Sequence, residues 1–379
     1  TVLTTGDVTA VISGGTVTGS AMSWGNKDKI SVVGGSYVKS TGAGGGTPAS
    51  TTAETGDISL SISGGTFTGA VFGGSVADNY GKEQASDSSL PDLSITTGVS
   101  SLLIEGGTFQ SSDHENPKNY DFGVFGGSAA LGQKSSTESS GSSVIIDAKK
   151  AIDIKGRVVG GDLLGFGGSG KNATSSTING STSVSITGSE KIETSESVIG
   201  GSLLHLTLDG ESSSSSISGT SSVFVDAENA TLGDEVIGGS YVRTQKDTGD
   251  ASASVKGASV TIKAGTINGN VVGGGKVNGK HGTVKSSVDG DTLISISGGT
   301  VNGAVIGGGH AKMGVGTFGD MSADVTGTSK IQITGGTVNG VIGGGLSFAY
   351  GTNGGDWKST ASVGKSEVII TGGTINAVN

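Results

Sequence analysis

Apolar and polar residues alternate in short runs along the whole chain. Leu293-Ile294-Ser295-Ile296-Ser297 and Ile331-Gln332-Ile333-Thr334 are clear examples. A period of two residues is typical of a β-strand with one buried face. No window shows an amphipathic helical stripe of useful length. The pattern therefore predicts an all-β fold.

A five-residue phrase repeats along the sequence: Val, then Val, Ile or Phe, then Gly-Gly, then usually Ser or Gly. Its nine copies begin at Val32, Val71, Val124, Val158, Val198, Val236, Val271, Val305 and Val341. The spacing settles near 36 residues in the late copies. Because this self-similarity covers the chain, it predicts one array of repeats and not several globular domains.

A second phrase precedes the first in most units: a short strand, a Gly-Gly corner, then Thr-x-Asn or Thr-x-Thr. Clear copies occupy 261–268, 296–302, 333–339 and 370–376. Each unit thus reads as strand, glycine corner, two short strands separated by a corner, a second glycine corner and a variable segment. Glycine suits these corners because it adopts positive φ without strain.

Such a unit cannot bury its apolar face alone, so it must stack on its neighbours. We expect a β-solenoid, a right-handed parallel β-helix of about ten coils and roughly 50 Å in length. About 36 residues trace roughly 120 Å of chain, more than a compact coil needs, so part of each unit should protrude as a hairpin or flap, as in 240–256. A division of each repeat into two coils of about 18 residues stays open.

The repeats predict a single β-solenoid domain over 1–379, with variable insertions around 41–57, 76–97 and 111–123. The chain stops at Asn379, just after the tenth strand phrase and without a closing Val-x-Gly-Gly. Solenoids end in caps that protect their edges. We therefore expect a fragment of a longer protein.

Composition narrows the possible partners. The net charge of −10 should repel phosphate backbones and anionic lipid, so we expect no nucleic acid partner. No apolar run approaches the ~18 residues of a membrane span, so we expect no membrane insertion by this segment. The chain has no cysteine, and its four histidines fall in different units. We therefore expect no metal site, no cofactor and no cysteine chemistry.

One unit departs from the repeat and is the place where an enzyme could have its site. Its corner has lost the glycine pair, and it gathers Asp147, Asp153, Lys155, Arg157 and Asp162. Carbohydrate-cleaving β-helices need charged residues that converge on one face. A polysaccharide-degrading enzyme with its site in 147–162 is the first alternative function, although irregular packing is the favoured interpretation.

The Thr-x-Asn phrases suggest a second alternative. If Val301 points inward, Thr300 and Asn302 point outward and form ranks about 4.8 Å apart along the rod. Regular threonine ranks bind ice in some β-solenoids. Because the ranks break in the middle units, hydrogen bonding between stacked side chains is the favoured role.

Aromatic residues outside the core phases indicate a contact surface. All 5 tyrosines fall after a Gly-Gly or in an insertion, and two of them share the phrase Gly-Gly-Ser-Tyr-Val. Exposed tyrosine and tryptophan suit stacking on sugars or docking of a partner. The candidate binding residues are Tyr37, Tyr241, Trp24, Trp357 and Tyr120. The alternative is that these rings cover the coil under its own flap.

Phrases such as the one at 298–309, Gly-Gly-Thr-Val-Asn-Gly-Ala-Val-Ile-Gly-Gly-Gly, resemble the passenger regions of bacterial autotransporter adhesins. The resemblance implies an extracellular or cell-surface protein of Gram-negative bacteria, with a signal peptide upstream and an outer-membrane β-barrel downstream. It implies a non-enzymatic adhesin or stalk that binds a host surface protein or glycan, or associates with itself. No catalytic residue of the family maps onto this chain.

Overall fold

One repeat of the sequence makes one turn of the structure. A representative turn contains β25 (Ser213–Asp226), β26 (Ala230–Leu232), β27 (Val236–Ile237) and β28 (Tyr241–Thr244). Each pairs in parallel with the equivalent strand of the next turn, as β27 does with β31 (Val271–Val272). The β-solenoid class is thus confirmed, and the division of each repeat into two coils is wrong.

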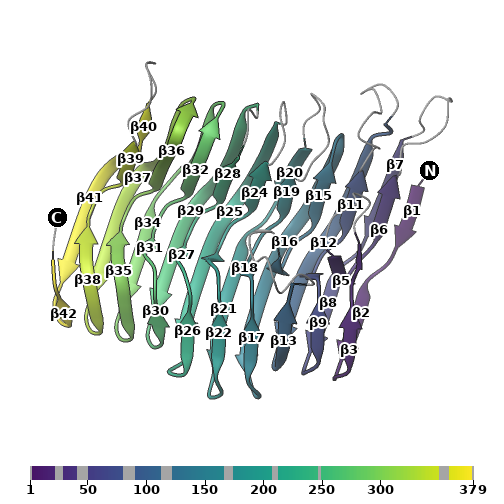
Figure 1. Ribbon diagram of the computed structural model, residues 1–379, viewed down its shortest axis with the longest axis horizontal. Helices are drawn as coiled ribbons and strands as arrows, with labels where there is room; N and C mark the ends of the chain where they lie inside the picture. The colour runs from purple at the N-terminus through teal and green to yellow at the C-terminus, as the bar shows by residue number, and fades with distance from the viewer. Residues whose placement is uncertain are drawn as a thin grey trace.

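The strands form three sheets, and each sheet takes strands from successive turns (Figure 1). The structure is a computed structural model that describes residues 2–21, 29–40, 50–79, 90–111, 122–165, 174–206, 212–245, 249–349 and 358–377. One turn stacks on the next in parallel, whereas β4 and β5 pair antiparallel within one turn. The rod therefore grows along the direction in which the strands hydrogen-bond.

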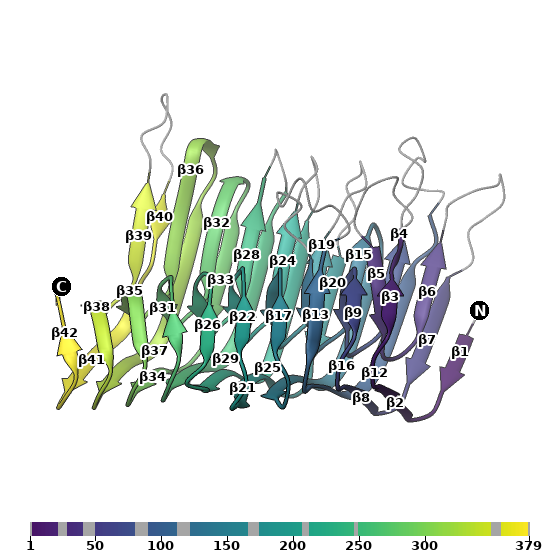
Figure 2. The same ribbon diagram turned by 60° about the horizontal axis from the view of Figure 1, so that its bottom comes forward.

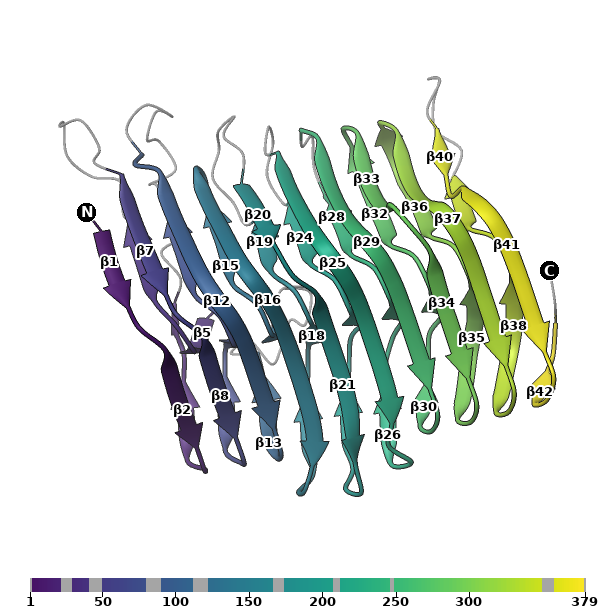
Figure 3. The same ribbon diagram turned by 180° about the vertical axis from the view of Figure 1, so that it is seen from behind.

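Sheet A is the 15-stranded sheet that contains the longest strands (Figure 3). Its strands are β1 (Val2–Thr5), β2 (Val8–Ile12), β7 (Thr51–Thr55), β8 (Ile58–Ile62), β12 (Leu93–Ile104), β16 (Ser135–Ala148), β20 (Thr174–Ile178), β21 (Thr182–Gly188), β25, β29 (Ala251–Ile262), β33 (Val284–Val288), β34 (Thr292–Ile296), β37 (Met321–Ile333), β40 (Ser359–Thr360) and β41 (Val363–Ile370).

Sheet B is the 18-stranded sheet of short strands that face sheet A. Its strands are β3 (Thr16–Thr18), β4 (Ser20–Ala21), β5 (Lys29–Val33), β9 (Thr66–Thr68), β10 (Ala70–Phe72), β13 (Gly107–Gln110), β14 (Gly123–Phe125), β17 (Ile152–Ile154), β18 (Arg157–Val159), β22 (Ile192–Thr194), β23 (Val198–Ile199), β26, β27, β30 (Thr266–Ile267), β31, β35 (Thr300–Ile306), β38 (Thr337–Ile342) and β42 (Thr374–Ile375).

Sheet C has nine strands, one fewer than the ten coils expected from the sequence. Its strands are β6 (Tyr37–Ser40), β11 (Val76–Asn79), β15 (Ala129–Gly132), β19 (Leu163–Gly165), β24 (Leu203–Leu206), β28, β32 (Lys276–His281), β36 (His310–Phe318) and β39 (Leu346–Ala349).

The main hydrophobic core lies between sheets A and B. Burial alternates along β29, so that Val260 and Ile262 point inward and pack in one cluster with Ile267 and Val271 of sheet B. Val305, in the Val-x-Gly-Gly phrase of the next turn, is fully buried in the same cluster. Equivalent residues of successive turns thus form continuous apolar stacks, which confirms the predicted core phases.

The segments expected to protrude as hairpins instead form a wall of the solenoid. In 240–256, β28 pairs with β24 and β32, whereas β29 pairs with β25 and β33. The two walls enclose a second core, in which Val242 of sheet C meets Ala253 of sheet A. In Figure 2 the rod runs horizontally, and the strands of sheet C lie above those of sheet B. Parts of the expected insertions 41–57 and 76–97 belong to these walls, since they include β7, β11 and the start of β12.

The two glycine corners need glycine for different reasons. In the Gly-Gly-Thr corner the second glycine has positive φ, as Gly299 shows at +74°. In the Val-x-Gly-Gly corner the turns approach too closely for a side chain. A Cβ on Gly238 would lie 2.6 Å from the carbonyl oxygen of Gly273 in the next turn. Positive φ therefore explains the first corner only, and turn-to-turn contact explains the second.

Candidate functional site

Tyr37 and Tyr241 both begin a strand of sheet C, but their surroundings differ. Tyr37 is 42% exposed, and its hydroxyl donates a hydrogen bond of 2.5 Å to Asp78 Oδ2. Burial and this acidic partner raise the pKa of Tyr37. Tyr241 is only 4% exposed, so the expectation that it is an exposed binding residue is wrong. Lys276 covers it, with Nζ 4.9 Å from the ring centroid. Three other candidates lie outside the described residues: Trp24, Tyr120 and Trp357.

The charged residues of the 147–162 unit do not converge on one face. Asp153 forms an ion pair with Lys155, with 2.9 Å between Oδ1 and Nζ. Arg157 instead reaches Glu196 of the next turn, at 3.5 Å. Asp162 is fully buried. This arrangement favours the packing interpretation of the unit over a catalytic one.

Asp162 belongs to a buried row that joins one turn to the next. The row consists of Ser36, Ser75, Ser128, Asp162, Ser202 and Ser240. The backbone N–H of Ser128 donates to Asp162 Oδ1 at 2.7 Å, and the hydroxyls of Thr137 and Ser176 donate to Oδ2 at 2.8 Å each. Burial raises the pKa of Asp162, although these hydrogen bonds oppose the rise. Both of its oxygens are therefore used inside the rod.

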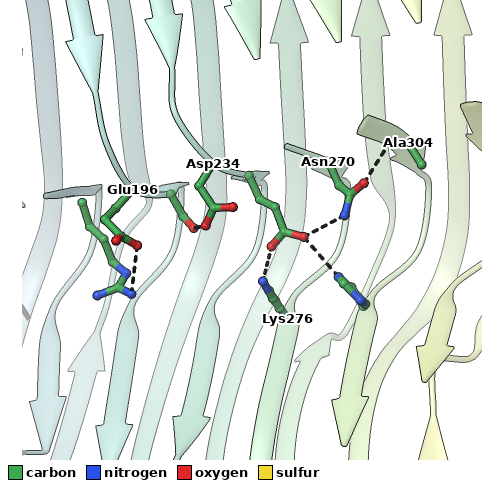
Figure 4. Close-up of polar contacts among 9 residues, drawn as sticks. Glu196, Asp234, Asn270, Lys276 and Ala304 are labelled. Carbon is green, nitrogen blue, oxygen red and sulfur yellow. Dashed lines mark hydrogen bonds and ion pairs between the residues drawn. The ribbon is translucent and has the colours of Figure 1, made fainter. Parts of the chain in front are cut away.

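A second polar row follows the corner between the two short strands that each turn contributes to sheet B, as between β26 and β27 (Figure 4). The row is made by contacts between successive turns: Arg157 Nη2 to Glu196 Oε2 at 3.5 Å, Ser197 Oγ to Asp234 Oδ2 at 2.7 Å, Asn270 Nδ2 to Glu235 Oε1 at 2.8 Å, and Ala304 N to Asn270 Oδ1 at 2.9 Å. Each contact bridges neighbouring repeats, so the row holds the turns in register.

Glu235 is the most connected residue of this row, and it is 5% exposed. Lys276 forms an ion pair with Oε2, and His310 Nδ1 lies 3.4 Å from Oε1. Burial alone would raise the pKa of Glu235, but His310 and Lys276 outweigh it and lower the pKa to about 2. Tyr241 and Glu235 likewise raise the pKa of Lys276 against the effect of burial. Glu235 is therefore ionised at neutral pH and is not poised for acid–base chemistry.

Sequence reasoning missed this cluster, although a comparison of the repeats contained its signal. The first residue of a sheet C strand is apolar in four consecutive turns, at Val76, Ala129, Leu163 and Leu203. The same position holds Lys276 and His310 in two later turns. A cation in a buried apolar position needs a compensating charge, and Glu235, in the corner between β26 and β27, supplies it.

The remaining predicted features have structural roles. Val301 is 1% exposed while Thr300 and Asn302 face outward, as expected. Asn302 Nδ2 donates to Asn268 Oδ1 of the previous turn at 3.1 Å, so stacking between side chains is confirmed. Across the part of the chain that the structure describes, no group of three or more His, Asp and Glu side chains is placed to hold a metal ion.

Comparisons with known proteins give no relative for this chain. No protein-family model, no curated protein and no solved structure matches it. The described residues contain no helix with the length and apolar character needed to cross a bilayer. The function has to be argued from the rod itself.

Proposed function

We propose that the chain is the rod of a cell-surface or secreted bacterial adhesin of the autotransporter passenger type. It acts as a non-enzymatic stalk that attaches to host cells, matrix or glycans, or to other bacterial cells. The observation that carries this proposal is the unbroken parallel stacking of sheet A from β1 to β41. Because each turn contacts only its neighbours, such a rod can present its faces far from an anchoring surface.

The outer face of sheet A repeats the same polar chemistry from turn to turn. One row of outward hydroxyls consists of Thr9, Ser59, Ser101, Ser143, Ser183, Ser222 and Ser259. A periodic face offers many equivalent weak contacts, and such contacts gain strength when they are made together. This supports attachment better than turnover of one bound molecule.

The positions of Asp153 and Asp162, the candidate catalytic acids, also support a role without catalysis. A hydrolase acting on sugars needs two carboxyl groups that flank one bond. Asp162 is inside the rod, and Asp153 is paired with Lys155 on its outside. The residues that suggested an enzyme therefore hold the fold together.

The test is surface display of the chain on a non-adherent bacterium, with attachment to epithelial cells, matrix proteins and sister cells counted after washing. The matched control is Val305→Asp, which should disrupt the rod while the display level is monitored by an epitope tag. We expect attachment or aggregation with the natural chain only. Equal attachment by the natural chain, Val305→Asp and the empty host would refute the proposal.

A further inference from the structure

The outer face of sheet C changes its chemistry along the rod. The third residue of each strand faces away from sheet A, and these residues form one row. In register the row reads Lys39, Asp78, Leu131, Gly165, His205, Arg243, Asn278, Lys312 and Phe348. Asp78, Leu131 and His205 are buried, whereas Arg243, Asn278 and Lys312 are partly exposed. The last turns thus open a basic strip on an acidic protein.

We propose that this strip, Asn278, Lys312 and Phe348 with His310 beneath, binds a saccharide that carries carboxylate or sulfate groups. Arg243, which has an interaction of its own, borders the strip. The proposal rests on the adhesin function and names the ligand class and the surface that binds it.

Charge complementarity is the first argument. The protein has a net charge of −10, so a basic strip contrasts with the rest of its surface. Lys276 lies next to the strip, but Glu235 neutralises it. Lys312 forms no ion pair with any described residue, and it is left to meet an external anion. A strip this short can contact only a few anionic groups, as on a sugar chain. A nucleic acid carries closely spaced phosphates, which the acidic rod on either side of the strip would repel.

Two further side chains supply what a sugar needs besides charge. Phe348 is 47% exposed and pairs in register with Lys312, so its ring can pack against the apolar face of a sugar. Asn278 pairs in register with Lys312 from the strand on the other side, β32, and its amide group can donate to and accept from sugar hydroxyl groups. The Lys312 ammonium, the Asn278 amide and the Phe348 ring therefore lie on three consecutive strands, and neighbouring strands are about 4.8 Å apart.

An unsatisfied polar atom under the strip is the independent observation. His310 is 5% exposed, and its Nε2 has no hydrogen-bond partner in the part of the chain that the structure describes. Its ring meets Phe348 edge-on, with 6.1 Å between centroids. Buried polar atoms in native proteins are almost always bonded. A sugar hydroxyl or anionic oxygen would satisfy this atom if the exposed Phe348 ring, which lies against His310, turned aside as the ligand binds.

The experiment measures binding of the full chain to hyaluronate, dextran sulfate and neutral dextran by biolayer interferometry at low and moderate salt. The first two probes distinguish carboxylate from sulfate as the group recognised. We expect at least one charged polymer to bind, with affinity that falls as salt rises. Lys312→Gln and Phe348→Ala should each weaken it tenfold or more, whereas Lys285→Gln and Leu293→Ala on sheet A should leave it unchanged.

Several results would overturn the proposal. They are no binding to either charged polymer, equally tight binding to neutral dextran, or equal losses in the strip and sheet A variants. Circular dichroism of each variant guards against a loss caused by misfolding. The displayed chain is tested for cell attachment in parallel. Attachment that survives Lys312→Gln and Phe348→Ala would remove the strip as the site and leave the adhesin function standing.

Discussion

Replacing Gly238 by alanine tests whether close approach between turns is the reason for the Val-x-Gly-Gly phrase. The new Cβ would lie 2.6 Å from Gly273 O and 3.2 Å from Val260 Cγ2. Ordinary contacts begin at 3.4 Å, so the two turns must separate locally by about 0.8 Å. Gly238 has no positive φ that could account for a loss of stability.

The cost can be worked from the bonds that this separation stretches. The N–H of Gly238 donates to Val272 O at 2.8 Å, and that of Gly239 donates to Gly274 O at 3.0 Å. Weakening both costs about 1 kcal/mol each, and overpacking adds about 1–3 kcal/mol. We expect Gly238→Ala to lower the free energy of unfolding by about 3–5 kcal/mol.

Gly257, on β29 of the next turn, provides a control. A Cβ there meets Asp291 O and Thr220 Cγ2 at 3.4 Å each, which is ordinary contact. Urea unfolding followed by circular dichroism should show Gly257→Ala within about 1 kcal/mol of the natural chain. If the two variants unfold alike, close approach is not what selects glycine in this phrase.

Three further substitutions test the core and the two buried carboxyls. Val305→Asp places an unpaired charge at a fully buried position and should destabilise the rod by more than about 4 kcal/mol; natural-like melting would show that the phrase is not buried. Glu235 has a lowered pKa, so its contribution is complete above its ordinary value of 4.5 and is lost as the pH falls through about 2. Glu235→Gln should abolish this acid-range dependence of the unfolding free energy on pH, which is worth about 3 kcal/mol. At pH 7 the variant should also lose about 3–5 kcal/mol of stability, because Lys276 stays buried without its partner. An unchanged pH dependence would show that Glu235 is not the group that titrates. Asp162 has a raised pKa, so stability should fall as the pH rises above its ordinary 3.8, and Asp162→Asn should remove this fall in the same urea titrations; an unaltered profile would place the titration elsewhere.

The sequence predicted those strands that have one buried face. In β29 the inward Val255, Val260 and Ile262 alternate with outward polar residues, and this alternation is visible without a structure. The sequence also predicted the corners between strands, because their glycines recur at the same position in most repeats.

Sheet C could not be found in this way, because several of its strands, from β11 to β24, are buried on both faces. In β24 all four residues from Leu203 to Leu206 are buried. The outward face packs against the second residue of the Val-x-Gly-Gly phrase, as Leu203 does with Ile199, while Leu204 enters the second core. A strand covered on both sides loses its period of two and reads as a short apolar run. The segment therefore suggested a flap where the rod has a wall.

Exposure in a solenoid depends on the neighbouring turns, which a single repeat does not contain. Tyr37 and Tyr241 have the same phase and the same flanking residues, yet only Tyr37 is exposed. What separates them is their place in the sheet: Tyr37 lies on the edge strand β6, whereas Tyr241 lies between Leu203 and Lys276 of the neighbouring turns. Glu235 holds Lys276 over the Tyr241 ring. Residues at one phase should therefore be compared across turns as a column. The column of first residues in sheet C then shows where Lys276 and His310 replace apolar residues, and it is there that the rod departs from its own repeat.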